Sequence, residues 1–464
     1  MSGLVLRDVE VDRRAGLDVR LEGGRIAEIG ARLGGGGEAI DGRGGALIAG
    51  LADHHIHLFA LAARAGSVTL DEVTDAQALR ERIAAALAAR PAGSWVRATG
   101  YHERMAGDLD AAALDALAPD HPVRVQHQTG SLWVLNSRAL AAVGAQAGPA
   151  SVERGPDGRP TGRIWRGDAW LRERLGDAPP ALAPVGAQLA RWGITHLTDA
   201  SVTTDAEAAT RLADAHRAGA LPQRLTLMSG GALAAPTDGA FRVGPVKVLL
   251  DDHALPELDC FAARIADARA WGRAVAVHCV TAAELALTLA AFDAAGARAG
   301  DRIEHGGVIP REAVGRLAEL GLSVVTQPAF VHERGDRYLA EVDRREQPDL
   351  YRCASLIAAG VPVAASSDAP YASADPWLGI AAATRRATRA GAELGPAERV
   401  SPDQALALYQ GDPAAPGGPA RRVQAGSPAD LCLLAVPLAQ ALAAPAAERV
   451  RATFVGGRLV YAAR

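Results

Sequence analysis

Asp53-His54-His55-Ile56-His57 places an aspartate and three histidines in one short segment, at the end of an apolar run that begins near residue 46. Because side chains alternate along a strand, Asp53, His55 and His57 share one face. Two imidazoles spaced in this way can bind one metal ion, and Asp53 could orient one of them through a hydrogen bond. Three histidines this close together also occur at surfaces and in cores, so the segment alone leaves both interpretations open.

Three more potential metal ligands end apolar runs further along the chain. His278 follows VAV, His305 follows RIE and Asp368 follows VAASS. If these runs are parallel strands of one barrel, their carboxyl ends meet at the same mouth. Imidazole and carboxylate groups are common ligands of zinc and related divalent metals. Together with His55 and His57, these residues predict a metal centre.

Lysine is almost absent from this chain. Lysine and arginine total 49, and Lys247 is the only lysine. A GC-rich coding bias explains the general use of arginine, but it does not explain why one position kept a lysine. Either Lys247 remained a lysine by chance, or its chemistry cannot be supplied by arginine.

The segments that must position these residues alternate between strand-like and helix-like patterns. Stretches such as PELDCFAARIADARAWG and TAAELALTLAAFDAAGARAG have helical spacing, with Pro or Thr near the start and Gly at the end. Eight strands that alternate with helices predict a parallel (β/α)8 barrel of the TIM type. The eight strand-like runs span residues 46–57, 194–201, 224–229, 243–252, 273–280, 301–307, 322–328 and 361–370.

The two ends of the chain differ from the middle. Residues 1–46 and 421–464 contain alternating apolar residues and Gly pairs, which are typical of hairpins. They predict a small β-sandwich domain assembled from both termini, with the barrel over residues 47–420. Residues 58–193 interrupt the barrel rhythm and are expected to form an insertion after the first strand. Such insertions at the carboxyl ends of strands often supply a lid or a specificity pocket.

With these motifs in place, the chain resembles the amidohydrolase superfamily, and within it the amidohydrolase-3 (YtcJ-like) branch. AGLADHHIH is similar to the PGFxDxHxH segment of the family, GITHLTDA to its GIT motif and PVKVLLDD to its VKLxxDG segment. VAVHC, DRIEHGG, VVTQPAF and SSDAPYASADP resemble the fifth to eighth strands of the branch, and PDQALALY and AGSPADLCLL its closing segments. The resemblance covers nearly the whole chain.

The resemblance implies a set of roles. His55, His57 and Asp368 would bind one metal, His278 and His305 a second, and Lys247 would be a carboxylated lysine that bridges the two. The implied chemistry is hydrolysis of a C–N, amide-like bond in a small molecule by metal-activated hydroxide, with Asp368 as the proton shuttle. A divalent metal, zinc first, is expected at one or two ions per chain.

The sequence departs from the family pattern around the expected substrate site. Asp251-Asp252 replaces the usual DG, and Ser131 stands where many relatives carry a histidine. These departures concern substrate recognition rather than metal chemistry. The candidate substrate-binding residues are Tyr101, His102, His127, Trp133, Asn136, His253, Gln327 and His332.

Composition limits the other function classes. The formal net charge is −4, so no basic excess indicates a nucleic-acid partner or an anionic membrane surface. The first residues lack the apolar run of a signal peptide, and no stretch approaches the ~20 apolar residues of a membrane span. The four cysteines are scattered without a CxxC pair. A cytoplasmic enzyme with a small-molecule substrate is expected, and a homodimer is left open.

Three alternatives to hydrolysis use the same residues. The metal site could serve a deaminase, a lyase or an isomerase on the same fold. Lys247 could instead act as the Schiff-base amine of a barrel aldolase. The chain could also be a binding protein without catalysis, although a scaffold has no need of so many metal ligands.

Overall fold

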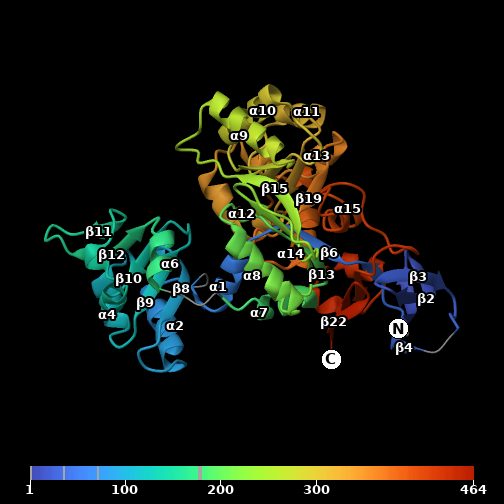
Figure 1. Ribbon diagram of the computed structural model, residues 1–464, viewed down its shortest axis with the longest axis horizontal. Coiled ribbons are helices and arrows are strands. Elements are labelled where there is room, and N and C mark those ends of the chain that lie inside the picture. The colour runs from blue at the N-terminus through green and yellow to red at the C-terminus, as the bar shows by residue number, and fades with distance from the viewer. Residues whose placement is uncertain (1–2, 35–36, 71–72, 176–179, 464) are drawn as a thin grey trace. The chain divides into compact units, whose positions relative to one another are not determined.

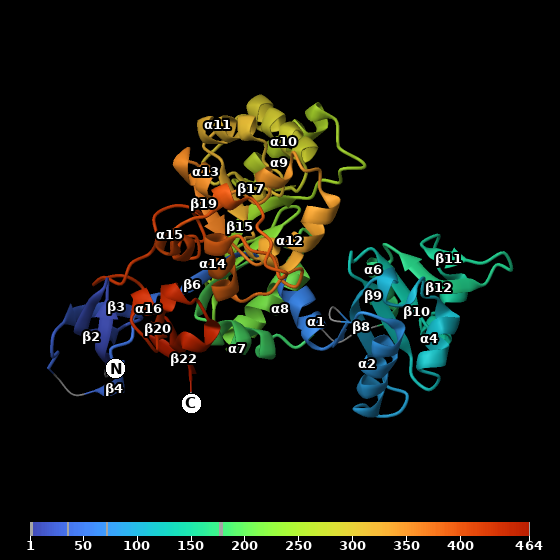
Figure 2. The same cartoon turned by 180° about the vertical axis from the view of Figure 1, so that it is seen from behind.

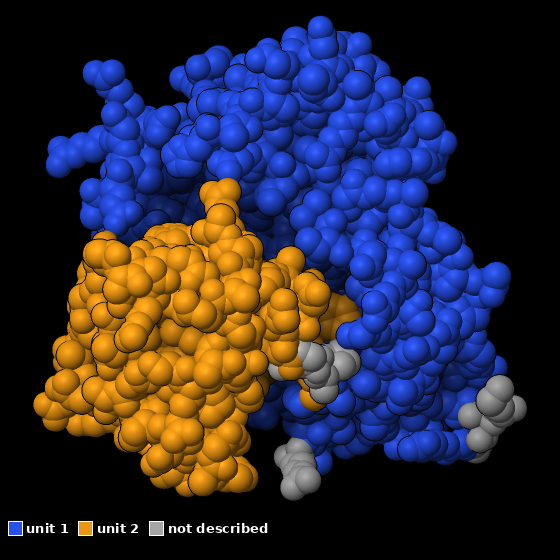
Figure 3. Space-filling view, turned by 60° about the vertical axis from the view of Figure 1, so that its left-hand side comes forward, with its two compact units in different colours: residues 1–58, 182–464 blue, residues 59–181 orange. Residues whose placement is uncertain are grey.

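The computed structural model describes residues 3–34, 37–70, 73–175 and 180–463. The chain divides into two compact units, shown in different colours in Figure 3. Unit 1 comprises Met1–Leu58 and Leu182–Arg464, and unit 2 comprises Phe59–Ala181. The domain boundaries expected from the sequence stay predictions.

The centre of unit 1 is an eight-stranded parallel sheet that curves into a barrel (Figures 1 and 2). The strands follow one another in the sheet in the order of the chain, as repeated βα units require. Most of their residues are buried, because helices cover the outside and side chains fill the inside. The predicted (β/α)8 barrel is thereby confirmed. The strands are β6 (Leu51–Ile56), β13 (Ile194–Asp199), β14 (Arg224–Ser229), β15 (Arg242–Val248), β16 (Val275–Cys279), β17 (Arg302–His305), β18 (Ser323–Thr326) and β19 (Val363–Ala365).

Helices with local start signals lie between and after these strands. Helix α10 begins at a capping box, in which the Thr281 hydroxyl accepts from the Glu284 N–H and the Glu284 side chain accepts in return, and it ends at Gly296. Helix α14 begins after Asp375, whose carboxylate accepts from the Trp377 N–H. The helices of this part are α7 (Ala183–Arg191), α8 (Ala206–Arg217), α9 (Leu258–Ala270), α10 (Ala282–Ala295), α11 (Arg311–Glu319), α12 (Ala329–Glu341), α13 (Ala354–Ala358), α14 (Pro376–Arg385), α15 (Pro402–Ala407) and the 3₁₀ helices η2 (Gln347–Asp349) and η3 (Pro396–Glu398).

The first and last barrel strands meet at a seam that differs from the other strand pairs. Within the described residues no strand ladder joins β19 to β6. Two backbone hydrogen bonds beyond the end of β19 close the gap instead: the Asp368 N–H donates to the His55 carbonyl at 2.8 Å, and the His57 N–H donates to the Ala369 carbonyl at 2.9 Å. The barrel therefore closes at the residues that the sequence singled out as metal ligands.

Both ends of the chain contribute β-structure to unit 1. Two four-stranded sheets have the orders β3-β2-β1-β4 and β22-β21-β20-β5. Apolar residues from both sheets, among them Val19, Leu431 and Phe454, form one buried cluster, as in a β-sandwich. The elements are β1 (Leu4–Val11), β2 (Arg14–Glu22), β3 (Arg25–Gly30), β4 (Glu38–Asp41), β5 (Leu47–Ala49), β20 (Leu431–Leu434), β21 (Val450–Val455), β22 (Arg458–Ala462), α16 (Leu438–Ala443) and η4 (Ala447–Arg449).

Unit 2 is built around a mixed sheet with the order β11-β12-β10-β9-β8-β7. Alternation along β10 places Leu132 and Trp133 in two separate apolar clusters, so side chains pack on both faces of the sheet. The elements that begin in or form this segment are α1 (Leu58–Ala65), β7 (Val68–Thr69), α2 (Ala76–Ala88), β8 (Val96–Tyr101), α3 (Glu103–Ala106), α4 (Ala111–Leu117), β9 (Val123–His127), β10 (Leu132–Leu135), α5 (Ser137–Ala142), η1 (Ala145–Ala147), β11 (Val152–Arg154), β12 (Pro160–Trp165) and α6 (Asp168–Leu175).

None of the described helices has both the length and the apolar character that a membrane crossing requires.

Candidate metal centre

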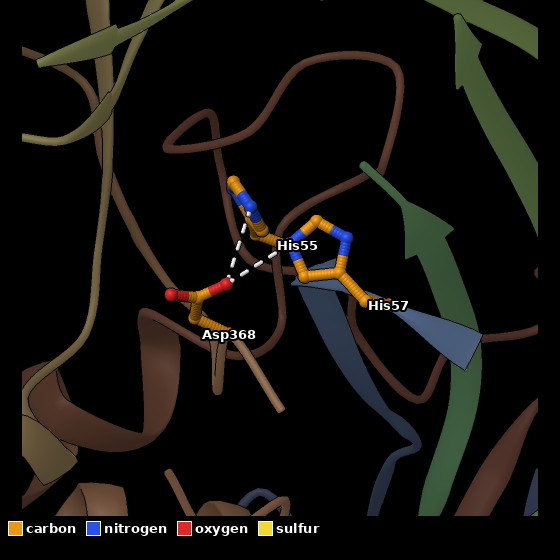
Figure 4. A group of neighbouring side chains, drawn as sticks. All are labelled: His55, His57 and Asp368. Atoms are coloured by element: carbon orange, nitrogen blue, oxygen red, sulfur yellow. Dashed lines mark ion pairs between the residues drawn. The ribbon is translucent and has the colours of Figure 1, made fainter. Parts of the chain in front are cut away.

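Three potential ligands from the two sides of the barrel seam point toward one another (Figure 4). His55 lies in β6, His57 follows that strand directly, and Asp368 follows β19. Asp368 Oδ1 lies 3.2 Å from His57 Nε2 and 3.5 Å from His55 Nε2. The potential ligand atoms of the three residues all lie within 4.8 Å of one another, which is close enough for one metal ion.

Two further histidines extend this group across the barrel mouth. His278 lies in β16 and His305 ends β17, and their ring centroids are 4.5 Å apart. The ring centroid of His305 is 4.7 Å from that of His55, and its Nδ1 is 3.8 Å from Asp368 Oδ2. The structure thus brings together all five histidine and aspartate ligands that the sequence predicted, although metal binding by them stays a prediction.

Two of these residues have unusual backbone conformations. His305 has φ +70° and Asp368 has φ +55°, in the left-handed region of backbone conformation that residues other than glycine rarely adopt. In a regular strand Glu304 and His305 would point to opposite faces, yet both reach His55. The positive φ of His305 turns its ring into the site. Such conformations are often found at functional sites, where the surrounding structure maintains them.

Three of the four imidazoles have a hydrogen-bond partner on Nδ1. His57 Nδ1 lies 3.1 Å from the Ser201 hydroxyl, and His305 Nδ1 lies 3.0 Å from Gln327 Oε1. His55 Nδ1 contacts the Glu304 carboxylate. Partners of this kind orient metal-binding imidazoles in many proteins.

Asp53 has a different role from the one expected. Its carboxylate accepts from the His55 N–H at 3.1 Å, from the Ser367 N–H at 3.1 Å and from the Ser367 hydroxyl at 2.5 Å. It therefore ties β6 to the segment after β19, and within the described structure its hydrogen bonds go to these groups rather than to an imidazole ring. Burial raises the pKa of Asp53 to about 6, although the hydrogen bonds from Ser367 oppose that shift.

Burial controls the electrostatics of the site. It lowers the pKa of His55 and of His305 well below the usual value, and it lowers the pKa of His278 to about 4. It also lowers the pKa of Lys247 to about 8. Removing a charged group from water disfavours its charged form. At neutral pH these three imidazoles are therefore neutral, which is the form that binds metal.

The donor set fits a divalent metal. His55 Nε2, Lys247 Nζ and Asp368 Oδ1 are buried and have no hydrogen-bond partner among the described residues. Buried polar atoms in folded proteins almost always have a partner, so three orphans in one place indicate a missing group. Imidazole nitrogen and carboxylate oxygen are the ligands that catalytic zinc prefers.

The candidate substrate-binding residues in unit 2 fall into two groups. Tyr101, Trp133 and Asn136 are buried and engaged within the unit: the Tyr101 hydroxyl donates to the Gly107 carbonyl, the Trp133 indole N–H donates to Asp168 at 2.7 Å, and the Asn136 side chain makes four hydrogen bonds to backbone atoms. These contacts give the three side chains a role in the architecture of unit 2. Their contact with a substrate stays a prediction.

His102 and His127 form the other group. Their rings lie 5.6 Å apart, and His127 Nε2 is 3.2 Å from Glu103 Oε2. In each ring Nδ1 accepts from a backbone N–H two residues later, that of Arg104 for His102 and that of Thr129 for His127. Each neutral ring therefore has its proton on Nε2. The Nε2–H of His127 donates to Glu103, and His102 offers an N–H donor rather than a metal-binding lone pair.

The three candidate substrate-binding residues in unit 1 lie in different parts of that unit. Gln327 lies under the metal centre, where it bridges His305 and the Ser366 hydroxyl. His253 is exposed in the loop after β15. His332 lies in α12, and its Nδ1 is 3.1 Å from the Ala387 carbonyl. Of these three residues, only Gln327 contacts a residue of the candidate metal centre in the described structure.

Residues 38–461 match the model of the amidohydrolase family. The chain belongs to this family. The match agrees with the resemblance to the amidohydrolase-3 branch that the motifs predicted, and that prediction is confirmed. Membership makes the protein a hydrolase.

Relatives along the whole chain support this assignment. The amidohydrolase is 26% identical to N-substituted formamide deformylase from Arthrobacter pascens over 507 residues, which covers 92% of each chain. It is 25% identical to the putative amidohydrolase YtcJ from Bacillus subtilis (strain 168) over 406 residues, or 75% of each chain. A crystal structure of an uncharacterized metal-dependent hydrolase from Pyrococcus furiosus has the same fold, with a TM-score of 0.71 and 20% identity over 92% of this chain and 97% of that one.

Sequence reasoning missed the two charged residues beneath the metal centre of this amidohydrolase. Arg302 and Glu304 lie in β17 and are 1% and 0% exposed, and Glu304 bridges Arg302 and His55. Both stand in the DRIEHGG segment that carried the family resemblance. A signal was present, because two opposite charges two residues apart in an apolar strand share one face.

Proposed function

We propose that this hydrolase uses a divalent metal centre to cleave a C–N, amide-like bond of a small molecule. The observation that carries the proposal is the convergence of four imidazoles and one carboxylate at the barrel mouth, with three orphaned polar atoms among the site residues. His55, His57 and Asp368 would hold one ion, and zinc fits this donor set best.

A second ion is part of the proposal. His278 and His305 would hold it, and a carboxylated Lys247 would bridge the two ions. Lys247 is 3% exposed, and its Nζ has no hydrogen-bond partner among the described residues. An ammonium group in that position lacks the acceptors it needs, whereas a carbamate would provide two oxygens as ligands. Arginine cannot form this group because it stays protonated.

The chemistry divides between the metal and the chain. When bound, a divalent metal polarises the substrate carbonyl and makes a water molecule more acidic. Asp368 accepts a proton from the attacking water as the new C–O bond forms. The same carboxyl then delivers that proton to the leaving nitrogen as the C–N bond breaks, so the carboxylate is regenerated. Burial of the site excludes other water from the proton transfer.

Substrate recognition is proposed for residues of both units. The exposed or half-buried candidates His102, His253 and His332 would contact a substrate through their ring nitrogens, and His127 would do so in place of its contact with Glu103. Tyr101, Trp133, Asn136 and Gln327 would act through the surfaces that they shape. The relative named N-substituted formamide deformylase makes N-substituted formamides the first class to test. A cytoplasmic location, a homodimer and the lack of nucleic-acid or membrane partners stay predictions.

The test is an assay of N-substituted formamides with metal-free and metal-loaded protein. Metal-free protein, prepared by chelation, should not release formate and amine, and added zinc should restore the release. Full turnover by metal-free protein would contradict the metal requirement. Release of ammonia from an amidine or aminated ring, without amide hydrolysis, would instead indicate a deaminase.

A further inference from the structure

A buried chain of three charged or polar side chains lies beneath the metal centre. The Arg302 guanidinium donates through Nε to Glu304 Oε1, and Glu304 Oε2 contacts His55 Nδ1. The side chains of Arg302, Glu304 and His55 are 1%, 0% and 1% exposed. Arg302 Nη2 also donates to the His54 carbonyl at 3.2 Å. The guanidinium is therefore held on two sides and fixes the orientation of the carboxylate.

We propose that Glu304 is a positioning residue that sets the tautomer of His55, with Arg302 holding Glu304 in place. A carboxylate can only accept hydrogen bonds, so the contact with Glu304 requires the His55 proton to be on Nδ1. The lone pair is then on Nε2, the atom that lies 3.5 Å from Asp368 Oδ1 and has no hydrogen-bond partner among the described residues. This inference rests on the proposed role of His55 as a metal ligand.

The hydrogen-bond partners of His57 and His305 determine the tautomers of those imidazoles less strongly. His57 Nδ1 faces the Ser201 hydroxyl, which can either donate or accept, so that contact does not select a tautomer. His305 Nδ1 faces the neutral amide oxygen of Gln327. Among the described residues, Glu304 is the carboxylate within hydrogen-bond distance of Nδ1 of an imidazole of the site, since Asp368 Oδ2 is 3.8 Å from His305 Nδ1. Hydrogen bonds to a charged acceptor are about twice as strong as those between neutral groups.

Stability does not explain why the Arg302–Glu304 pair is there. Removing both charges from water costs about as much as their attraction returns, and apolar residues of the same volume often stabilise a core as well or better. The barrel interior thus carries an expensive pair of charges next to a metal ligand. Setting the tautomer of His55, the proposed metal ligand, gives that pair of charges a function.

The first experiment needs no variant. Nitrogen-15 NMR of the metal-free wild-type protein distinguishes the two neutral tautomers of a histidine, and a His55→Asn sample assigns the signal. We expect the proton of His55 on Nδ1 at neutral pH. A predominantly Nε2-protonated His55 would overturn the proposal.

The second experiment measures zinc affinity by competition with a chelator, for wild type, Glu304→Gln and Glu398→Gln. Glu398 is the matched control, because it is 2% exposed and pairs with the buried Arg352 at 2.6 Å, while its hydrogen bonds within the described residues go to Arg352, Cys353 and Ser355. We expect Glu304→Gln to weaken zinc binding about 10–100-fold, as loss of such a partner typically does. Glu398→Gln should leave zinc affinity within about twofold of wild type while lowering stability.

The outcomes separate the two proposals. Wild-type protein that binds no zinc would contradict the proposed function, whatever the variants do. Wild-type protein that binds zinc, together with a Glu304→Gln variant of equal affinity, would overturn only the role of Glu304. An equal loss in Glu304→Gln and Glu398→Gln would assign the effect to general destabilisation and would also overturn it. If Glu304→Gln does not fold, the NMR measurement on the wild type still decides.

Discussion

Asp368 is the carboxylate that faces two imidazoles at once, with Oδ1 3.2 Å from His57 Nε2 and 3.5 Å from His55 Nε2. We expect Asp368→Asn to reduce turnover by at least 100-fold, because asparagine keeps the shape but cannot accept the proton, and general acid–base catalysis typically contributes ~10²–10⁴-fold. Steady-state kinetics with circular dichroism as the folding control test this. A variant that keeps more than about a tenth of the wild-type rate would require another base.

Lys247 offers a second test at the scale of one residue. We expect Lys247→Arg to be as inactive as Lys247→Ala, because arginine can neither form a carbamate nor bind metal. Metal analysis should show a decrease from about two ions per chain to one or none. A mononuclear centre predicts one ion and an active Lys247→Arg enzyme, so that result would refute the bridge. Borohydride trapping with substrate would detect a Schiff base at Lys247 instead.

The candidate ligand residues were predictable from the sequence, whereas the contact of Glu304 with His55 was not. His278, His305 and Asp368 stand at the ends of apolar runs, and the barrel brings strand ends together whatever the details of the loops. Glu304 precedes His305, and regular alternation places it on the other face. Only the positive φ of His305 shows that both side chains serve one site, and a backbone angle of that kind has no sequence signature at a histidine.

Among the elements, the seam between β6 and β19 depends on side chains more than the other strand pairs do. Ser367 donates to Asp53 and accepts from the Ala369 N–H at 2.9 Å. We expect Ser367→Ala to lower the free energy of unfolding by about 1–3 kcal/mol, because it leaves a buried carboxylate short of a donor. Urea titration measures this, and zinc affinity should decrease as well.

Ser229→Ala is the matched control for the seam. Ser229 is also a buried barrel serine with a bonded hydroxyl, but it lies at the end of β14, where Arg273 keeps other acceptors if the hydroxyl is lost. This variant should be less destabilised and should bind zinc like the wild type. Equal loss of zinc affinity in both variants would mean that the seam has no special connection with the metal centre.

The start of α14 gives a prediction about pH. Burial raises the pKa of Asp375 to about 6, and the charge of Glu448 adds to that shift. Because the raised pKa favours the neutral acid in the folded protein, this group stabilises the fold below its unfolded pKa of about 4, and that contribution is lost as the pH rises through about 6. Asp375→Asn keeps an N-cap without the charge.

Thermal unfolding of wild type and Asp375→Asn at several pH values tests this effect. We expect the variant to gain up to roughly 2 kcal/mol over wild type at a pH of about 7.5, and to gain little at a pH of about 4.5. A difference that is the same at both pH values would show that the carboxyl group has an ordinary pKa.

The barrel strands could be read from the sequence because both of their faces are buried, which makes each an apolar run bounded by polar turns. The helices and strands of unit 2 were harder to predict from the sequence. Strands β7 and β11 have only two and three residues. Strands that short carry too little alternation to distinguish them from loops.

For the whole molecule, the division into two units separates metal binding from the proposed substrate contacts. The candidate ligands lie in unit 1, and His102 and His127 lie in unit 2. We expect His102→Ala and His127→Ala to raise KM for an N-substituted formamide several-fold while leaving zinc content unchanged, because a lost hydrogen bond to substrate costs about 0.5–1.5 kcal/mol. Unchanged kinetics in both variants would indicate that this pair does not contact substrate.

The seam also affects how the protein reaches its native state in a cell. Asp53 bonds to Ser367, which lies 314 residues later in the chain. At bacterial or eukaryotic synthesis rates a ribosome needs roughly 15–60 s to cover that distance. During this interval His55 and His57 are present without their carboxylate partner, and the edge of β6 that Asp368 later joins is unpaired. A chain truncated before β19 holds only part of the donor set. Under the proposed function, stable retention of zinc would therefore require a chain that extends beyond Asp368.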